Sequence, residues 1–82
     1  METIYSVNVV ERNDFDLNSI VRVFRTKADA LKWIKILKNI YKPIIKECNW
    51  ETDYEAADGL SAGEDGRYAE NSIVINLKQH KL

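Results

Sequence analysis

The hydrophobic positions of the chain first follow the two-residue period of a β-strand. In residues 4–12, Tyr5, Val7 and Val9 alternate with polar side chains, which is typical of a strand with one buried face. Residues 19–25 are again rich in β-branched side chains, although their alternation leaves open which face is buried. The turn-rich segment between the two runs predicts that they pair as an antiparallel hairpin.

From Thr26 the period changes to that of an amphipathic helix. Thr26 and Asp29, three residues apart, form a variant of the capping box in which a hydroxyl caps the first turn. Over residues 27–42, helical spacing places the large apolar side chains in one arc and most lysines in the opposite arc. The apolar arc contains Ala30, Trp33, Ile34, Ile36, Leu37, Ile40 and Tyr41. We expect this arc to pack on the sheet.

Pro43 is expected to end or kink this helix, because proline lacks an N–H and its ring crowds the carbonyl one turn earlier. Two interpretations remain for residues 44–50, a kinked continuation and a short strand. Glu47 and Glu51 would enter the apolar arc if the helix continued, which favours an end near residue 42.

The C-terminal part of the chain divides into a predicted loop and a predicted strand. Residues 52–69 hold all three glycines and many acids, so we expect a mobile acidic loop. Residues 72–78 alternate as a strand, and residues 79–82 read as a short tail. The pattern therefore predicts a single α+β domain over residues 1–82. It would be a small antiparallel sheet of three to four strands with one amphipathic helix packed on one face, in the order β-β-α-(β)-β.

Composition narrows the class of protein. Of the 82 residues, 45% are hydrophobic and 30% are charged, which is within the range of globular domains. Cys48 is the single cysteine, so no intramolecular disulfide can form and a cytoplasmic location is expected. We identify no signal peptide and no apolar run long enough to span a membrane.

The charges separate into two opposite halves behind a net charge of −1. Residues 1–46 carry nine basic and five acidic side chains, a balance of +4. Residues 47–70 carry eight acids and one base, Arg67, a balance of −7. A field of this kind steers and orients partners, so it points to association rather than to chemistry.

Catalytic and metal-binding patterns are weak. Cys48 would need a base, and the only histidine, His80, lies in the expected tail. The segment from Asp53 to Glu64 departs from a calcium-binding loop at its sixth position, which is Asp58 rather than glycine. We therefore expect no enzyme activity, no cofactor and no metal.

The acidic segment supports the first functional hypothesis, a non-enzymatic protein-binding module. It would dock on a basic, nucleic-acid-handling protein as an inhibitor or adaptor of the type that phages and mobile elements encode. Its predicted partner-binding residues are the acids of this segment and one tryptophan: Glu47, Trp50, Glu51, Asp53, Glu55, Asp58, Glu64 and Asp65.

The lysine face of the helix supports an alternative, a nucleic-acid-binding domain. Lys27, Lys35, Lys38 and Lys42 would follow the phosphate backbone. The isoelectric point near 5.8 ranks this hypothesis second, since nucleic-acid-binding domains are usually strongly basic. No membrane partner is expected, and the oligomeric state is left open.

Overall fold

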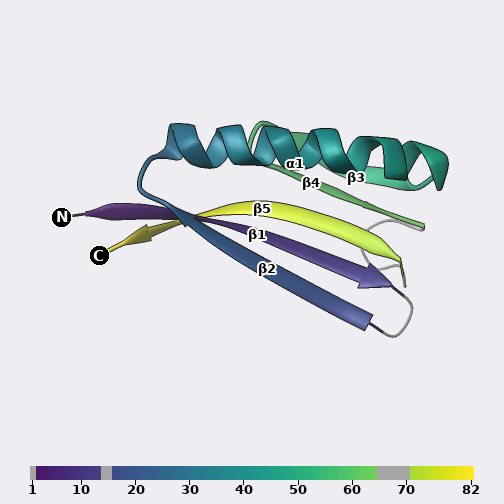
Figure 1. Ribbon diagram of the computed structural model, residues 1–82, viewed down its shortest axis with the longest axis horizontal. Coiled ribbons are helices and arrows are strands. Elements are labelled where there is room, and N and C mark those ends of the chain that lie inside the picture. The colour runs from purple at the N-terminus through teal and green to yellow at the C-terminus, as the bar shows by residue number, and fades with distance from the viewer. Residues whose placement is uncertain (1, 14–15, 65–70) are drawn as a thin grey trace.

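The fold is α+β, as predicted, but its sheet is larger than expected. A computed structural model describes residues 2–13, 16–64 and 71–82. These residues form β1 (Thr3–Asn13), β2 (Asp16–Phe24), α1 (Lys27–Glu47), β3 (Glu51–Ala56), β4 (Gly59–Gly63) and β5 (Ser72–Lys81). The strands make one sheet in the order β2-β1-β5-β4-β3, with every neighbouring pair antiparallel. Helix α1 lies along one face of it (Figure 1).

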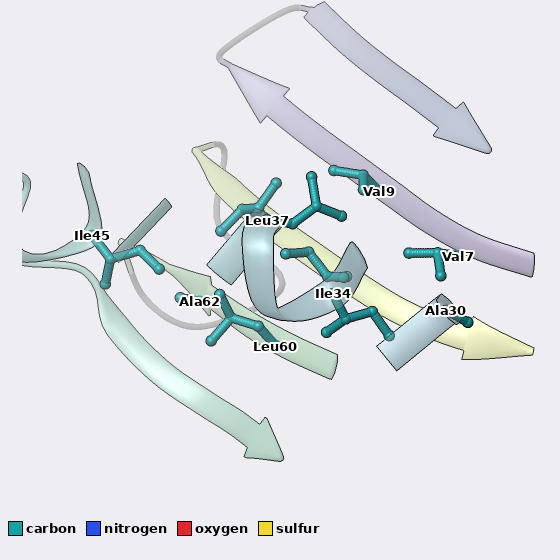
Figure 2. Packing of buried hydrophobic residues seen from close by; sticks show 10 residues of the cluster. Val7, Val9, Ala30, Ile34, Leu37, Ile45, Leu60 and Ala62 are labelled. Carbon is teal, nitrogen blue, oxygen red and sulfur yellow. The ribbon is translucent and has the colours of Figure 1, made fainter. Parts of the chain in front are cut away.

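The core lies between α1 and the middle of the sheet (Figure 2). Val7 and Val9 of β1 are buried, and the register places Ile75 of β5 opposite Val9. From the helix, Ile34 and Leu37 pack into the same cluster. The predicted alternation of β1 is confirmed, because its buried positions lie on the face shared with α1. The predicted apolar arc of α1 is confirmed in part, because Ile36 and Ile40 are 50% and 55% exposed.

The N-terminus of α1 is also as predicted. The Thr26 hydroxyl accepts a hydrogen bond from the Asp29 N–H at 3.2 Å, which satisfies one of the donors left free in the first turn. Ala30, one turn later, is fully buried. Trp33 and Tyr41 of the same arc are partly buried and pack at the border of the core.

The helix does not end near residue 42, and residues 44–50 do not form a strand. Helix α1 runs through Pro43 to Glu47. It ends where Asn49 takes the left-handed backbone conformation, with φ 56°. The Asn49 N–H bonds to the Lys46 carbonyl at 3.2 Å and the Trp50 N–H bonds to the Ile45 carbonyl at 2.9 Å. This pair of bonds is the Schellman motif, a common helix terminator.

Pro43 is tolerated because the helix gains more beyond it than it loses. A proline inside a helix costs about 3 kcal/mol. Pro43 and Asn39, whose carbonyl has no helical donor because of it, are both exposed, so water can satisfy that carbonyl. The extra turn buries Ile45 and packs Trp50 against the core, and burying a large apolar side chain contributes roughly 1.5–3 kcal/mol.

The expected acidic loop is wrong over most of its length, because residues 51–63 form the β3–β4 hairpin. Strand β4 lies between β3 and β5, and all five of its residues are buried. Apart from Leu60, the residues of β4 are small, and this suits its position: a Cβ on Gly59 would lie 2.5 Å from the Ile75 carbonyl oxygen. Residues 65–69 of that predicted loop lie outside the described residues. Strand β5 extends to Lys81, so His80 belongs to the sheet and not to a tail.

Asn49 provides a test of the helix terminator. We expect Asn49→Gly to raise the free energy of unfolding by a few tenths to about 1 kcal/mol, because glycine adopts positive φ without steric penalty. Asn49→Ala should lower it by about 1 kcal/mol for the converse reason. Urea denaturation followed by circular dichroism measures both changes.

Asn39→Gly is the matched control, since Asn39 is exposed inside α1. There glycine should lower stability slightly, because helical φ gives it no advantage and its backbone entropy is higher. Equal effects of glycine at positions 39 and 49 would contradict this assignment of the helix end.

Candidate functional site

The acids predicted to bind a partner gather around β3, which forms one edge of the sheet. Between residues 47 and 64 the chain has six acids and no basic side chain. Glu51, Asp53 and Glu55 lie on β3 itself, and Asp58 lies in the turn to β4. We call these four residues the acidic edge. All four are exposed.

The remaining predicted acids lie near the start of β3 or outside the described chain. Glu47 is the last residue of α1, and Glu64 follows β4, whose Gly63 pairs with Glu51. Glu64 accepts a hydrogen bond from the side-chain amide of Asn71. Asp65 lies outside the described residues.

Strand β3 is irregular. Its pairing with β4 shifts register between Thr52 and Tyr54, so that Asp53 is an extra residue in the strand. Such a bulge increases the local twist of an edge strand and interrupts its pairing pattern. The edge therefore presents its carboxylates on a twisted strand of only six residues.

Glu55 joins the acidic edge to the helix. Its carboxylate lies 2.9 Å from the Lys42 Nζ and 3.9 Å from the Lys38 Nζ. The hydrogen bond from Lys42, followed by the charge of Lys42, lowers the pKa of Glu55. Lys38 also donates a hydrogen bond to the Ala56 carbonyl at 2.6 Å. Lys38 and Lys42, which were proposed to bind nucleic acid, thus contact Glu55, which was proposed to bind a protein partner.

These contacts divide the four lysines proposed for nucleic-acid binding. The Lys38 side chain is only 14% exposed, so it is directed to β3 rather than to an external phosphate. Lys42 is half exposed but paired with Glu55. Lys35 lies on the exposed side of α1, and Lys27 lies at its first turn. The continuous lysine face expected from helical spacing is therefore interrupted by the β3–β4 hairpin.

The aromatic residue at the acidic edge is Tyr54, which the sequence analysis did not select. Tyr54 is 49% exposed. Its hydroxyl donates to Asp58 at 2.6 Å, and this hydrogen bond is the main cause that raises the pKa of Tyr54. An aromatic with a polar end, placed between acids, was the available signal. Trp50, which was selected, is instead half-buried against the core.

A hollow lies on the sheet face opposite α1. It encloses about 740 Å³ and is lined by residues of β1, β2 and β5. Within it the Ser6 hydroxyl and the His80 Nε2 are 2.8 Å apart. These are the side-chain types of a nucleophile and its base. Ser6 is only 8% exposed, so we interpret the bond as a tie between β1 and β5. Residues 74 positions apart gave no sequence signal for it.

Three comparisons with known proteins assign this chain to no family and no fold relative. No family model, no curated protein and no solved structure matches the chain. Within residues 2–13, 16–64 and 71–82, no three histidine, cysteine or acidic side chains are grouped as a metal site would require. No helix in this part of the chain is long and apolar enough to cross a bilayer.

Tyr41 is expected to make the folded protein less stable at alkaline pH. Its hydroxyl donates to the Glu11 carboxylate. Burial, together with this hydrogen bond and the charge of Glu11, raises the pKa of Tyr41 from 10.0 to about 12. The unfolded chain then loses this proton before the folded protein does. The contribution of Tyr41 to stability is therefore full below pH 10 and is lost as the pH rises to about 12.

We expect the free energy of unfolding to fall between pH 10 and about pH 12. In the Tyr41→Phe variant this decrease should be smaller. Urea denaturation at a series of alkaline pH values measures the slope. Identical slopes for the parent and Tyr41→Phe would show that Tyr41 ionises equally easily in the folded and unfolded chains.

Proposed function

We propose that this chain is a non-enzymatic protein-binding module that docks on a basic protein surface through the acidic edge. The observation that carries the proposal is the exposed edge strand β3, which lies in a stretch of six acids without a base. Carboxylates concentrated on one side of a small domain attract a basic surface and orient it during the encounter.

Side chains, rather than backbone, account for the proposed docking. A partner strand added to a sheet edge needs a regular row of N–H and C=O groups. The bulge at Asp53 interrupts that row in β3. The partner would therefore recognise the carboxylates of Glu51, Asp53 and Asp58, with Tyr54 as an exposed aromatic contact. Glu55 contributes less, because Lys42 already neutralises it.

The ordered hairpin changes how docking would occur. The sequence suggested a mobile loop that becomes ordered on binding, and such ordering reduces affinity. In the structure the carboxylates are held on β3, and the turn to β4 is fixed by the bond between Tyr54 and Asp58. A surface that is already ordered does not lose conformational entropy on binding in this way. Its affinity therefore depends mainly on charge and shape.

The proposed partner is a basic protein that handles nucleic acid, and the module would act on it as an inhibitor or adaptor. Sites that bind phosphates are lined by lysine and arginine, and carboxylates can form charge-assisted hydrogen bonds with both. The acidic edge would occupy such a groove in competition with the nucleic acid. Binding of nucleic acid by the chain itself, through Lys27 and Lys35, is the competing outcome.

Neutralisation of carboxylates in and beside the acidic edge tests this proposal. The variant Glu47→Gln, Glu51→Gln retains Glu55 and Asp58, whose hydrogen bonds belong to the fold, and Asp53, which also interacts within the chain. We expect it to bind a fluorescent lysine- and arginine-rich peptide at least about tenfold more weakly at low salt, because each neutralised carboxylate removes a long-range attraction. Fluorescence anisotropy at several salt concentrations measures the affinity, which should fall as salt increases.

The matched control is Lys27→Gln, Lys35→Gln, which removes charge of the opposite sign from exposed positions. It should bind the basic peptide at least as well as the parent. If the neutralised variant keeps full affinity for the peptide, the acidic edge is not the docking surface. If the parent binds labelled DNA or RNA and the lysine variant does not, the nucleic-acid hypothesis is the correct one.

A further inference from the structure

The two edges of the sheet are built in opposite ways. Edge strand β3 is six residues long, carries three carboxylates and contains a bulge. These are the features with which proteins prevent other strands from pairing with an edge. Edge strand β2 has nine residues in unbroken register with β1. It contains no proline and no lysine, and Asp16 and Arg22 are its only charged residues.

Strand β2 also exposes apolar side chains on both of its faces. The register with β1 places Ile20 on the face toward α1 and places Leu17, Val21 and Val23 on the opposite face. These four side chains are between 57% and 62% exposed. Figure 1 shows β2 at the side of the sheet away from α1. Nothing in the described chain covers these side chains.

The helix has exposed apolar residues directed to the same side. Arg22 of β2 lies over the Trp33 ring, 4.5 Å from its centroid, and this contact joins α1 to β2. Ile36 lines the hollow beside them and is 50% exposed. Ile40, one turn further along α1, is 55% exposed. A strip of apolar side chains therefore continues from β2 up the side of the helix.

We infer that β2 pairs with β2 of a second copy of this chain, forming a symmetric dimer with one continuous sheet. Two identical strands pair antiparallel about a two-fold axis perpendicular to the sheet. When all nine residues of one β2 strand pair with those of the other, Ile20 lies on the axis. Leu17 then lies opposite Val23, and Asn18 lies opposite Arg22. Each pair lies on one face of the sheet, and no two like charges are opposed.

Charge selects this pairing over the alternatives. Two β3 edges would bring Glu51, Asp53 and Glu55 against the same carboxylates of the other copy. Pairing of β2 with β3 would leave free edges and build an open filament, and it would place three acids beside a strand whose one basic residue is Arg22. Of the three possible edge pairings, only that of β2 with β2 forms a closed dimer through apolar side chains and opposes no like charges.

The available surface sets an upper limit on the size of the dimer interface. Leu17, Ile20, Val21 and Val23 and the two helical isoleucines each offer roughly 100 Å² of apolar surface. Complete burial of these side chains and of the backbone of a nine-residue strand would approach the ~800 Å² per partner of a standard interface. Both helices would lie on the same face, so Ile36 and Ile40 of each copy face the groove above the joined β2 strands.

Ile20→Lys tests the dimer, because it places two ammonium groups opposite each other on the axis. By light scattering coupled to gel filtration, we expect the parent at twice the 9.5 kDa chain mass and Ile20→Lys at the chain mass. The matched control, Thr52→Lys on the other edge, should remain dimeric. Ile20 is 61% exposed, and circular dichroism checks that each variant is folded.

A cross-link tests the register independently of any destabilising change. In a Cys48→Ser background, Ile20→Cys should join two chains through a short bifunctional thiol reagent, since directly opposed Cβ atoms lie roughly 5 Å apart. Thr52→Cys in the same background should not. A parent that is monomeric at micromolar concentrations, a dimeric Ile20→Lys protein, or equal cross-linking at positions 20 and 52 would each overturn the inference.

Discussion

The structure depends on one geometric constraint, the burial of a single amphipathic helix on a sheet too wide for it. A helix is about 10 Å across, whereas adjacent strands lie roughly 4.8 Å apart. One helix can therefore cover about three of the five strands. Helix α1 covers the middle of the sheet, where Val7, Ile34, Leu60, Ile73 and Ile75 are almost completely buried. The two edge strands and the face opposite α1 remain accessible, and the two proposed docking surfaces are centred on the edge strands.

The two uncovered edges divide the proposed roles of the molecule. At β3 the exposed side chains are mainly carboxylates, and Lys38 and Lys42 of α1 hold the strand through Glu55 and the Ala56 carbonyl. At β2 they are mainly aliphatic, and the contact with α1 is the cation–π pair of Arg22 and Trp33. Long-range charge favours rapid, salt-sensitive encounters, whereas apolar burial favours a stable contact. The acidic edge therefore suits a basic partner, and β2 suits a second copy.

Sequence periodicity predicted the long elements that bury one face and missed the two short strands β3 and β4. The period of two found β1 and β5, and the period of 3.6 found α1, because hydrophobic burial imposes both patterns. Strand β4 (Gly59–Gly63) has five residues, of which only Leu60 has a large side chain. It is too short to show a clear period, and its position depends on pairing with both neighbours. Pro43 was given too much weight and Asn49 too little, because the terminator needs a positive φ that the sequence does not display.

The candidate site was predictable as a set of residues but not as an arrangement. The acids of residues 47–64 and the lysines of α1 are evident in the sequence, and their signs suggested two separate surfaces. Their contact at Glu55 arises only because β3 folds back beside α1. Amide hydrogen exchange over residues 51–63 tests this account most directly. It predicts slow exchange in β4, which is bonded on both sides, and slower exchange in β3 than in an unstructured chain. Exchange at the unstructured rate throughout 51–63 would contradict the ordered hairpin and the surfaces built on it.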